Sequence, residues 1–187
     1  MKNPDANHTH ADFAVWIDGK QLDFSSKEYM SEELTPAEEE VLKNQTGSLA
    51  NADRATMLKY LHLHDSNGHV IHRHKPSLTL ADFFTSIRLG FKGNCMTSGV
   101  PMQDGEQCSK YPFRLFVNGH EMPFDLSYVF IDTDHILITT VADQTELEKE
   151  LKQMTDDACL YSKTCPWRGK APTENCIADP NVPCTNS

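Results

Sequence analysis

The chain has 187 residues, of which 39% are hydrophobic and 9% aromatic, as in an ordinary globular protein. Its 17 basic and 27 acidic residues give a formal net charge of -10, which disfavours nucleic acid and anionic lipid surfaces as partners. No stretch approaches the ~18 apolar residues of a transmembrane segment. Length and composition together predict a histidine-bearing domain over residues 8–157, in which residues 31–59 form an acidic insertion. Residues 158–187 are predicted to follow as a disulfide-stabilised tail.

The first half of the chain predicts two β-hairpins separated by the insertion. Residues 10–24 alternate apolar and polar side chains around Asp18-Gly19, a dipeptide typical of two-residue hairpin turns. The insertion is polar and acidic, with a short helix expected after Thr35-Pro36. Residues 60–74 then predict the second hairpin, which turns at Ser66-Asn67-Gly68.

The middle of the chain predicts one helix with a clear apolar stripe. Thr79 is its expected N-cap and Gly90 its expected end, and the residues of the stripe are Leu80, Phe83, Phe84 and Ile87. Residues 92–111 follow as a long polar loop that would lack order without a crosslink between Cys95 and Cys108.

Two more strand pairs and a helix complete the predicted domain. Residues 113–117 reach a turn at Asn118-Gly119, and residues 129–131 turn at 132–134 into a strand over 136–141. A capping box of Thr145 and Glu148 starts a helix that carries Leu147, Leu151 and Met154. This order predicts an α+β fold in which a mixed or antiparallel sheet packs on a central helix, β-grasp-like, with a disulfide-rich C-terminal tail of loops.

Six cysteines occur, at positions 95, 108, 159, 165, 176 and 184, and none forms a Cys-x-x-Cys motif. An even number without that motif predicts structural disulfides and therefore an oxidising, extracytoplasmic compartment. We expect Cys95 to pair with Cys108 and the last four cysteines to pair among themselves, in an order that the spacing leaves open. Residues 1–5 do not resemble a signal peptide, so export would require a targeting segment absent from this chain.

Three His-x-His motifs use six of the nine histidines, namely His8, His10, His62, His64, His72 and His74. Alternate residues of a strand project from the same face, so the two histidines of each motif can reach a common ion. A lone motif is more often a polar sheet surface, but three motifs favour a metal site. Neutral imidazole suits zinc or copper and argues against calcium or magnesium.

The register of the second hairpin decides whether its histidines cooperate. A two-residue turn at Asn67-Gly68 would scatter them over both faces. A three-residue loop over 66–68, with Gly68 in the left-handed region, places His62 opposite His72 and sends Leu61, Leu63 and Ile71 to the core. Only the second register separates polar from apolar side chains, so we predict it. His8, His10 and Asp12 would complete the cluster if the first strand lies beside this hairpin.

Several functions are compatible with this pattern. The first is metal binding or handling, and the second is a metalloenzyme with three histidines on zinc or copper and an open fourth position. Asp12 and Asp65 are the carboxylates adjacent to the motifs. Each is a candidate general base, a group that orients an imidazole, or a residue that closes a turn. A pH-sensing histidine cluster and a disulfide-stabilised cell-surface interaction domain without metal are the alternatives. His120 and His135 are expected to be ordinary surface residues.

The His-x-His-Ala-Asp-Phe opening within residues 8–30, the His-Leu-His-Asp hairpin and the Asp-Ala-Cys…Cys-Pro tail together resemble an uncharacterised family of small exported bacterial and archaeal proteins. The resemblance spans nearly the whole chain and implies export and a similar architecture. The name protein-disulfide isomerase is sometimes given to such sequences, but that activity is not implied here, because the chain has no Cys-x-x-Cys motif and no thioredoxin-like strand pattern.

Overall fold

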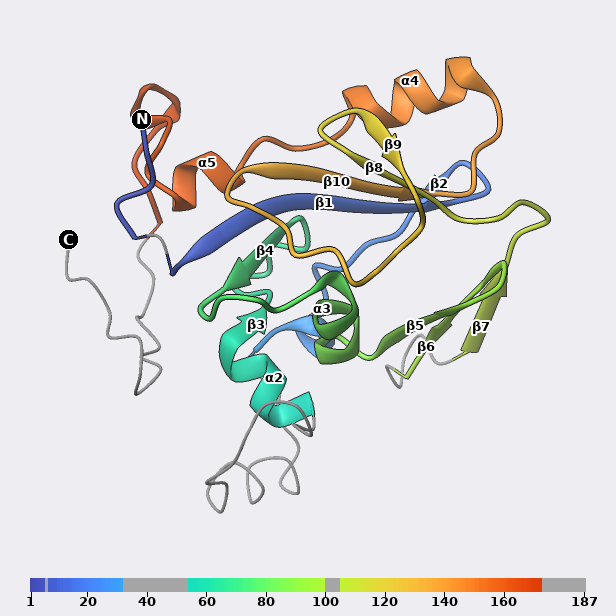
Figure 1. Ribbon diagram of the computed structural model, residues 1–187, viewed down its shortest axis with the longest axis horizontal. Helices are drawn as coiled ribbons and strands as arrows, with labels where there is room; N and C mark the ends of the chain where they lie inside the picture. Colours follow the sequence, from blue (N-terminus) through green and yellow to red (C-terminus); the bar gives the residue numbers. More distant parts are fainter. Residues whose placement is uncertain (6, 32–53, 100–104, 173–187) are drawn as a thin grey trace.

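A mixed seven-stranded sheet is the frame of the protein (Figure 1). The structure, a computed structural model, describes residues 1–5, 7–31, 54–99 and 105–172. The strands run in the order β3-β4-β1-β10-β8-β9, with β2 paired to β1. Their bounds are β1 Thr9–Ile17, β2 Lys20–Gln21, β3 Leu61–His62, β4 Val70–Arg73, β8 Arg114–Val117, β9 His120–Met122 and β10 Asp134–Thr139.

Strand β1 lies at the centre of this sheet and is buried along its whole length. It pairs in parallel with β10 and antiparallel with β4. Phe13, Val15 and other alternate residues of β1 enter the main core, while Ala14 and Trp16 enter a second cluster on the opposite face. The predicted hairpin turn is confirmed, because Asp18 and Gly19 both have positive φ angles, of 50° and 78°.

Helices cover both faces of the sheet, as Figure 1 shows, with α3 on one side and α4 and α5 on the other. The helical segments are η1 Lys27–Tyr29, α2 Arg54–Tyr60, α3 Leu80–Ser86, α4 Gln144–Lys152, α5 Ala158–Tyr161 and η3 Pro166–Arg168. The predicted stripe of α3 lies in the main core, and Leu147 of α4 lies in the second cluster. The sequence pattern did not predict α2, which leads directly into β3.

Two predicted helix ends were wrong. Helix α3 starts at the expected Thr79 cap, which forms a capping box with Asp82, but it ends at Ser86 instead of Gly90. Arg88 adopts a positive φ of 61° there, and the chain turns at once into a strand. Helix α4 is capped by Asp143, whose side chain accepts the Glu146 N–H, and not by Thr145. The shift in α4 arises because the Asp143 side chain offers an alternative N-cap, whereas α3 ends early because the backbone turns at Arg88.

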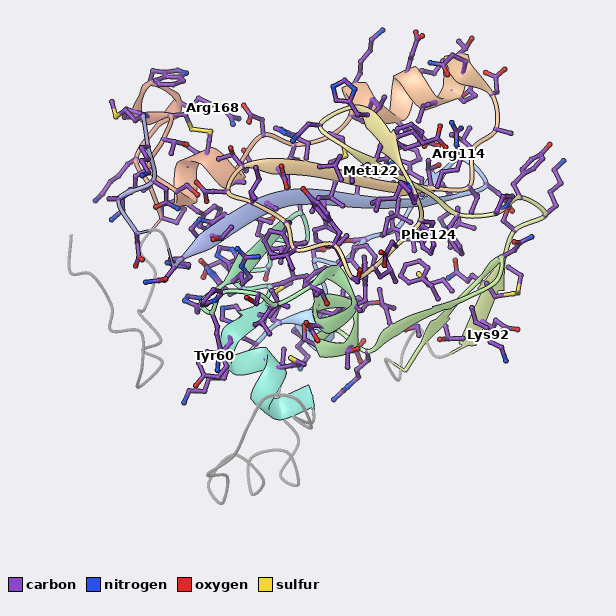
Figure 2. The ribbon with its side chains drawn as sticks, viewed as in Figure 1. Tyr60, Lys92, Arg114, Met122, Phe124 and Arg168 are labelled. Atoms are coloured by element: carbon purple, nitrogen blue, oxygen red, sulfur yellow. A yellow bond between two sulfur atoms is a disulfide. The ribbon has the colours of Figure 1, made fainter. Side chains whose placement is uncertain are left out.

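The segment predicted as a long polar loop is a small antiparallel sheet. Its strands are β5 Leu89–Lys92, β6 Cys95–Ser98 and β7 Gly105–Cys108. Cys95 lies opposite Cys108 in the register, and the predicted disulfide between them is confirmed, with a Cα–Cα distance of 4.0 Å. In Figure 2, Lys92 marks this sheet at the end of the molecule opposite Arg168 of the tail.

The second hairpin adopts the predicted register. His62 pairs with His72, and the backbone N–H of His74 donates to the Tyr60 carbonyl at 2.7 Å. The predicted left-handed conformation of Gly68 was wrong, because Asp65 and Ser66, not Gly68, have positive φ angles. A Cβ on Gly68 would lie 2.5 Å from the backbone of Phe24, so close approach of two chain segments requires this glycine.

Residues 129–131 are not a strand, which corrects the last predicted strand pair. Phe130 is instead buried, and its carbonyl accepts from the Arg73 guanidinium at 2.8 Å. The Asn118-Gly119 turn is confirmed, with φ angles of 52° and 78°. Asp134 fixes the loop before β10 by accepting from the Ile131 N–H, the Tyr128 hydroxyl and the Asn118 side-chain amide.

The fold is α+β with a mixed sheet, as predicted, while the likeness to a β-grasp and the division at residue 157 stay predictions. The tail contains α5 and η3 and a Cys159–Cys165 disulfide, so the part of it that the structure describes is not only loop. The helix expected after Thr35-Pro36, Cys176 and Cys184 lie outside the described residues. Among the helices that the structure describes, none is long and apolar enough to cross a membrane.

Candidate metal centre

Strand pairing brings the three His-x-His motifs together. The antiparallel pairing of β1 with β4 sets His10 opposite His72, and the pairing of β3 with β4 sets His62 opposite the same His72. The adjacency of the first strand and the second hairpin, which the sequence left as an assumption, is therefore present. Because alternate residues share a face, His8, His64 and His74 lie on the same side of the sheet as these three.

The six imidazoles form a closed ring. In the order His8, His10, His72, His64, His62, His74 and back to His8, neighbouring ring centroids are 3.8–5.7 Å apart. His72 also lies 6.3 Å from His8 and 6.0 Å from His62 across the ring. The cluster is mostly inside the protein: His72 is 0% exposed, His10 1%, His62 3% and His74 6%. His8 and His64 are only partly buried, and 13% of the His64 side chain is exposed.

The orientation of His10 is fixed through a serine of the tail. Ser162 donates its hydroxyl proton to the Asp132 carboxylate at 2.6 Å, so its oxygen accepts from His10 Nδ1 at 2.7 Å. Asp132 also accepts the backbone N–H of His10 at 3.1 Å. Nδ1 of His10 therefore carries the proton, and its Nε2, which faces His8, presents a lone pair.

Two further imidazoles are oriented in the same way. His62 Nδ1 lies 2.6 Å from the Leu58 carbonyl oxygen of α2, which can only accept, so Nδ1 is the protonated nitrogen. His64 Nδ1 lies 2.8 Å from the Asp65 carboxylate. In each case the proton is held on the outward nitrogen. Nε2 is therefore the unprotonated nitrogen, the one whose lone pair suits a cation.

The nitrogens that face one another have the spacing of ligands around one ion. Nε2 of His8 and Nε2 of His10 form a hydrogen bond of 3.1 Å, and Nε2 of His64 and Nδ1 of His72 form another of 3.1 Å. Two nitrogens bound to a tetrahedral zinc ion are separated by about 3.3–3.4 Å, given Zn–N bonds of 2.0–2.1 Å. One nitrogen from each of His8, His10 and His72 also falls within 4.8 Å of the other two.

The tail forms a wall of this site. The Tyr161 ring lies 4.6 Å from His72, 5.6 Å from His10 and 5.9 Å from His64, between centroids. Its hydroxyl accepts from the Asn67 side-chain amide at 3.2 Å. Packing of Tyr161 and Ala158 against Val70 of β4 holds α5 on the sheet. Residues far apart in the sequence therefore enclose the histidines.

Asp12 anchors that tail and does not point its oxygens at the histidines. Its carboxylate accepts from the Thr155 hydroxyl at 2.6 Å and from the backbone N–H groups of Asp157 and Ala158 at 2.8 and 2.9 Å. Burial raises the pKa of Asp12, and these hydrogen bonds and His135 oppose the rise. This anchoring of the tail is a role that the sequence did not predict for Asp12. Asp65, in contrast, contacts a histidine directly.

The remaining groups of potential ligands are less suited to a transition metal. Cys95 and Cys108 lie near Glu106, but they form a disulfide. Asp12, His135 and Asp156 also come together, with 3.4 Å between His135 Nε2 and Asp156. Both oxygens of Asp12 already accept hydrogen bonds there. His120 is exposed on β9, as expected.

Sequence reasoning missed the groups that orient the imidazoles, which are Ser162, Asp132, the Leu58 carbonyl and the Tyr161 ring. No local pattern identifies Ser162 and Asp132, because they lie 152 and 122 residues from His10 in the chain. Ser162, His10 and Asp132 contain the residue types of a hydrolase triad in the wrong order. Here the serine lies between the histidine and the carboxylate, and its hydroxyl donates a hydrogen bond to the carboxylate instead of to the imidazole. It is therefore not activated by the histidine as a nucleophile.

The arrangement is a buried histidine cluster that can hold a metal ion. Its imidazoles are preoriented by hydrogen bonds to a serine, a carbonyl and a carboxylate, as metal-binding histidines usually are. Comparison of the chain with protein families, with curated proteins and with solved structures finds no match.

Proposed function

We propose that this protein binds a transition-metal ion, zinc or copper, through the histidine cluster. The ligands are drawn from His8, His10, His62, His64, His72 and His74, and His8, His10 and His72 form the closest set of three. The orientation of His10, His62 and His64 carries the proposal. Each holds its Nδ1 proton on an acceptor outside the cluster, which leaves Nε2 for a cation.

The donor set selects the class of metal. Every candidate ligand is a nitrogen of intermediate softness, which suits zinc and copper, whereas calcium and magnesium require oxygen ligands. Sulfur is not among the nearby donors, because the cysteines described all form disulfides. The net charge of -10 favours the approach of cations.

The same proposal includes an extracytoplasmic location and the resemblance to small exported bacterial and archaeal proteins of β-grasp-like architecture. Two described disulfides support it, since such bonds persist in oxidising compartments and are rare in the cytosol. Binding or handling of the metal is favoured over catalysis. Neither carboxylate that the sequence offers as a general base is available, because Asp12 holds the tail and Asp65 holds His64.

The test is the metal content and metal affinity of protein purified without a polyhistidine tag. We expect at least one equivalent of zinc or copper by inductively coupled plasma mass spectrometry. His10→Ala should weaken the affinity by more than about 100-fold, beyond the 10–100-fold typical of groups that only orient a ligand. His120→Ala is the matched control and should have no effect. Equal losses in the two variants, or a chain that stays empty in excess zinc and copper at neutral pH, would refute the proposal.

A further inference from the structure

The cluster contains the same arrangement of groups twice. In the first half, the Asp132 carboxylate acts through Ser162 on Nδ1 of His10, whose Nε2 lies 3.1 Å from Nε2 of His8. In the second half, the Asp65 carboxylate contacts Nδ1 of His64 directly, and Nε2 of His64 lies 3.1 Å from Nδ1 of His72. Each half therefore offers a pair of nitrogens at ligand spacing, with an anionic group behind it.

The two histidines outside these pairs, His62 and His74, lie next to each other and connect the two halves of the ring. His74 lies against the first pair, with 4.0 Å between its ring centroid and that of His8. His62 lies between the halves, with its ring centroid 4.9 Å from that of His74, 5.7 Å from that of His64 and 6.0 Å from that of His72. The hydrogen bond from His62 Nδ1 to Leu58 leaves Nε2 as its possible ligand. His74 and His62 are therefore the candidate third ligands of the first and second pairs.

We propose that the cluster binds two transition-metal ions, one in each half. The first ion is held by His8 and His10 with His74, and the second by His64 and His72 with His62. This inference rests on the proposed function and goes beyond it in the number of ions. When a single ion is bound, His72 completes the set with His8 and His10, since one nitrogen of each lies within 4.8 Å of the others.

Two carboxylates near the cluster favour the binding of a second cation. Six neutral imidazoles add no negative charge, so two divalent ions in one buried site would repel each other. Asp65 and Asp132 place one carboxylate beside each half, 59% and 25% exposed respectively. A carboxylate that accepts a hydrogen bond from a ligating histidine increases the basicity of that ligand. The second ion is nevertheless expected to bind more weakly than the first.

The stoichiometry can be measured by native mass spectrometry of the tag-free protein titrated with zinc. We expect two zinc ions per wild-type chain at saturation. His64→Ala should lose one ion and retain the other, because it removes a ligand from the second half alone. His64 is only partly buried, so this substitution is expected to leave the fold intact, which circular dichroism would verify. His10→Ala should also retain one ion, and the double variant should retain none.

Copper provides an independent readout of the same arrangement. With two equivalents of Cu²⁺, electron paramagnetic resonance should show dipolar coupling between neighbouring ions, and His64→Ala should give the uncoupled spectrum of one ion. His135→Ala is the control for the group formed with Asp12 and Asp156. Loss of the second ion in that variant, or saturation of the wild-type chain at one ion, would overturn the two-ion proposal and leave the proposed function standing. Binding of no ion would overturn both.

Discussion

Two disulfide-closed segments of similar chemistry have different roles in this molecule. Cys95–Cys108 joins neighbouring strands of the small sheet, whose strand β7 is exposed along its length. Cys159–Cys165 closes a shorter loop around α5, and both of its cysteines are buried. Between them lie Tyr161 and Ser162, which contact the histidines. The first bond secures a peripheral sheet, whereas the second shapes a wall of the candidate site.

The difference follows from what each segment can bury. The small sheet packs Met96 and Phe91 against the main core, and its outer strand faces solvent. The tail segment buries only the small apolar cluster of Ala158 and Tyr161 with Val70, and it is held in addition by the hydrogen bonds of Asp12 with Thr155, Asp157 and Ala158. Function in the tail is therefore expected to depend on a few contacts, and four sets of variants test the comparison.

The largest effect is expected for Asp12→Ala. The variant removes a buried acceptor of three hydrogen bonds and leaves two backbone N–H groups without it, which should cost about 2–4 kcal/mol in the free energy of unfolding. Urea denaturation measures this change. Metal affinity should fall as well, because the tail loses its anchor. Asp12→Asn, which keeps the shape and one acceptor oxygen, should lie between wild type and Asp12→Ala. An unchanged unfolding midpoint would show that Asp12 does not hold the tail.

The paired removal of each disulfide compares the two segments directly. Replacing Cys95 and Cys108 by serine should lower the free energy of unfolding by about 3 kcal/mol and leave metal affinity unchanged. Replacing Cys159 and Cys165 should cost only about 2 kcal/mol, because the closed loop is shorter. It should nevertheless weaken zinc binding by about tenfold, because Tyr161 and Ser162 lose their support. Equal effects of the two pairs on zinc affinity would remove the distinction drawn between the segments.

Ser162→Ala isolates the hydrogen bond that orients His10. The substitution leaves His10 Nδ1 without its serine acceptor, and zinc affinity should fall by about 10–100-fold, as is typical when a group that orients a ligand is removed. Competition with a chromophoric chelator measures this change. Ser127→Ala, at an exposed serine that contacts only Asp125 in the described contacts, is the matched control. If both variants bind zinc like the wild type, the tail does not act through His10.

The smallest effect is expected for Tyr161→Phe. The ring and its contacts with three histidines remain, and the variant removes the hydroxyl that accepts from Asn67 at 3.2 Å. The free energy of unfolding should change by about 0.5–1.5 kcal/mol. Zinc affinity should stay within about threefold of wild type. Tyr161→Ala, which removes the ring as well, should weaken zinc binding further. A large loss of zinc in the phenylalanine variant would assign the hydroxyl a direct role at the metal.

The sequence predicted the histidine face of the sheet because strand geometry is periodic. Only one register of the second hairpin sends Leu61, Leu63 and Ile71 to the core, and that register also gathers His62 and His72. The turns at Asp18-Gly19 and Asn118-Gly119 were predictable for a similar reason, since both positions require positive φ angles.

The groups around the histidines could not be predicted in this way. Ser162 and Asp132 reach His10 from segments that are far away in the chain, and sequence spacing carries no information about such contacts. Gly68 shows the same limit. A turn motif explains a glycine locally, but its actual cause is the approach of Phe24 from another part of the chain. Local rules therefore predict which side chains share a face, and tertiary packing determines what surrounds them.

X-ray absorption spectroscopy of the metal-loaded protein tests most directly whether the histidines hold the metal. At the zinc or copper edge, we expect a first shell of nitrogen at about 2.0 Å with the multiple-scattering pattern of at least three imidazoles and with no sulfur. His10→Ala should reduce the imidazole count, and His120→Ala should leave the spectrum unchanged. A shell of oxygen without imidazole scattering, or one containing sulfur, would contradict the account and place the metal elsewhere on the chain.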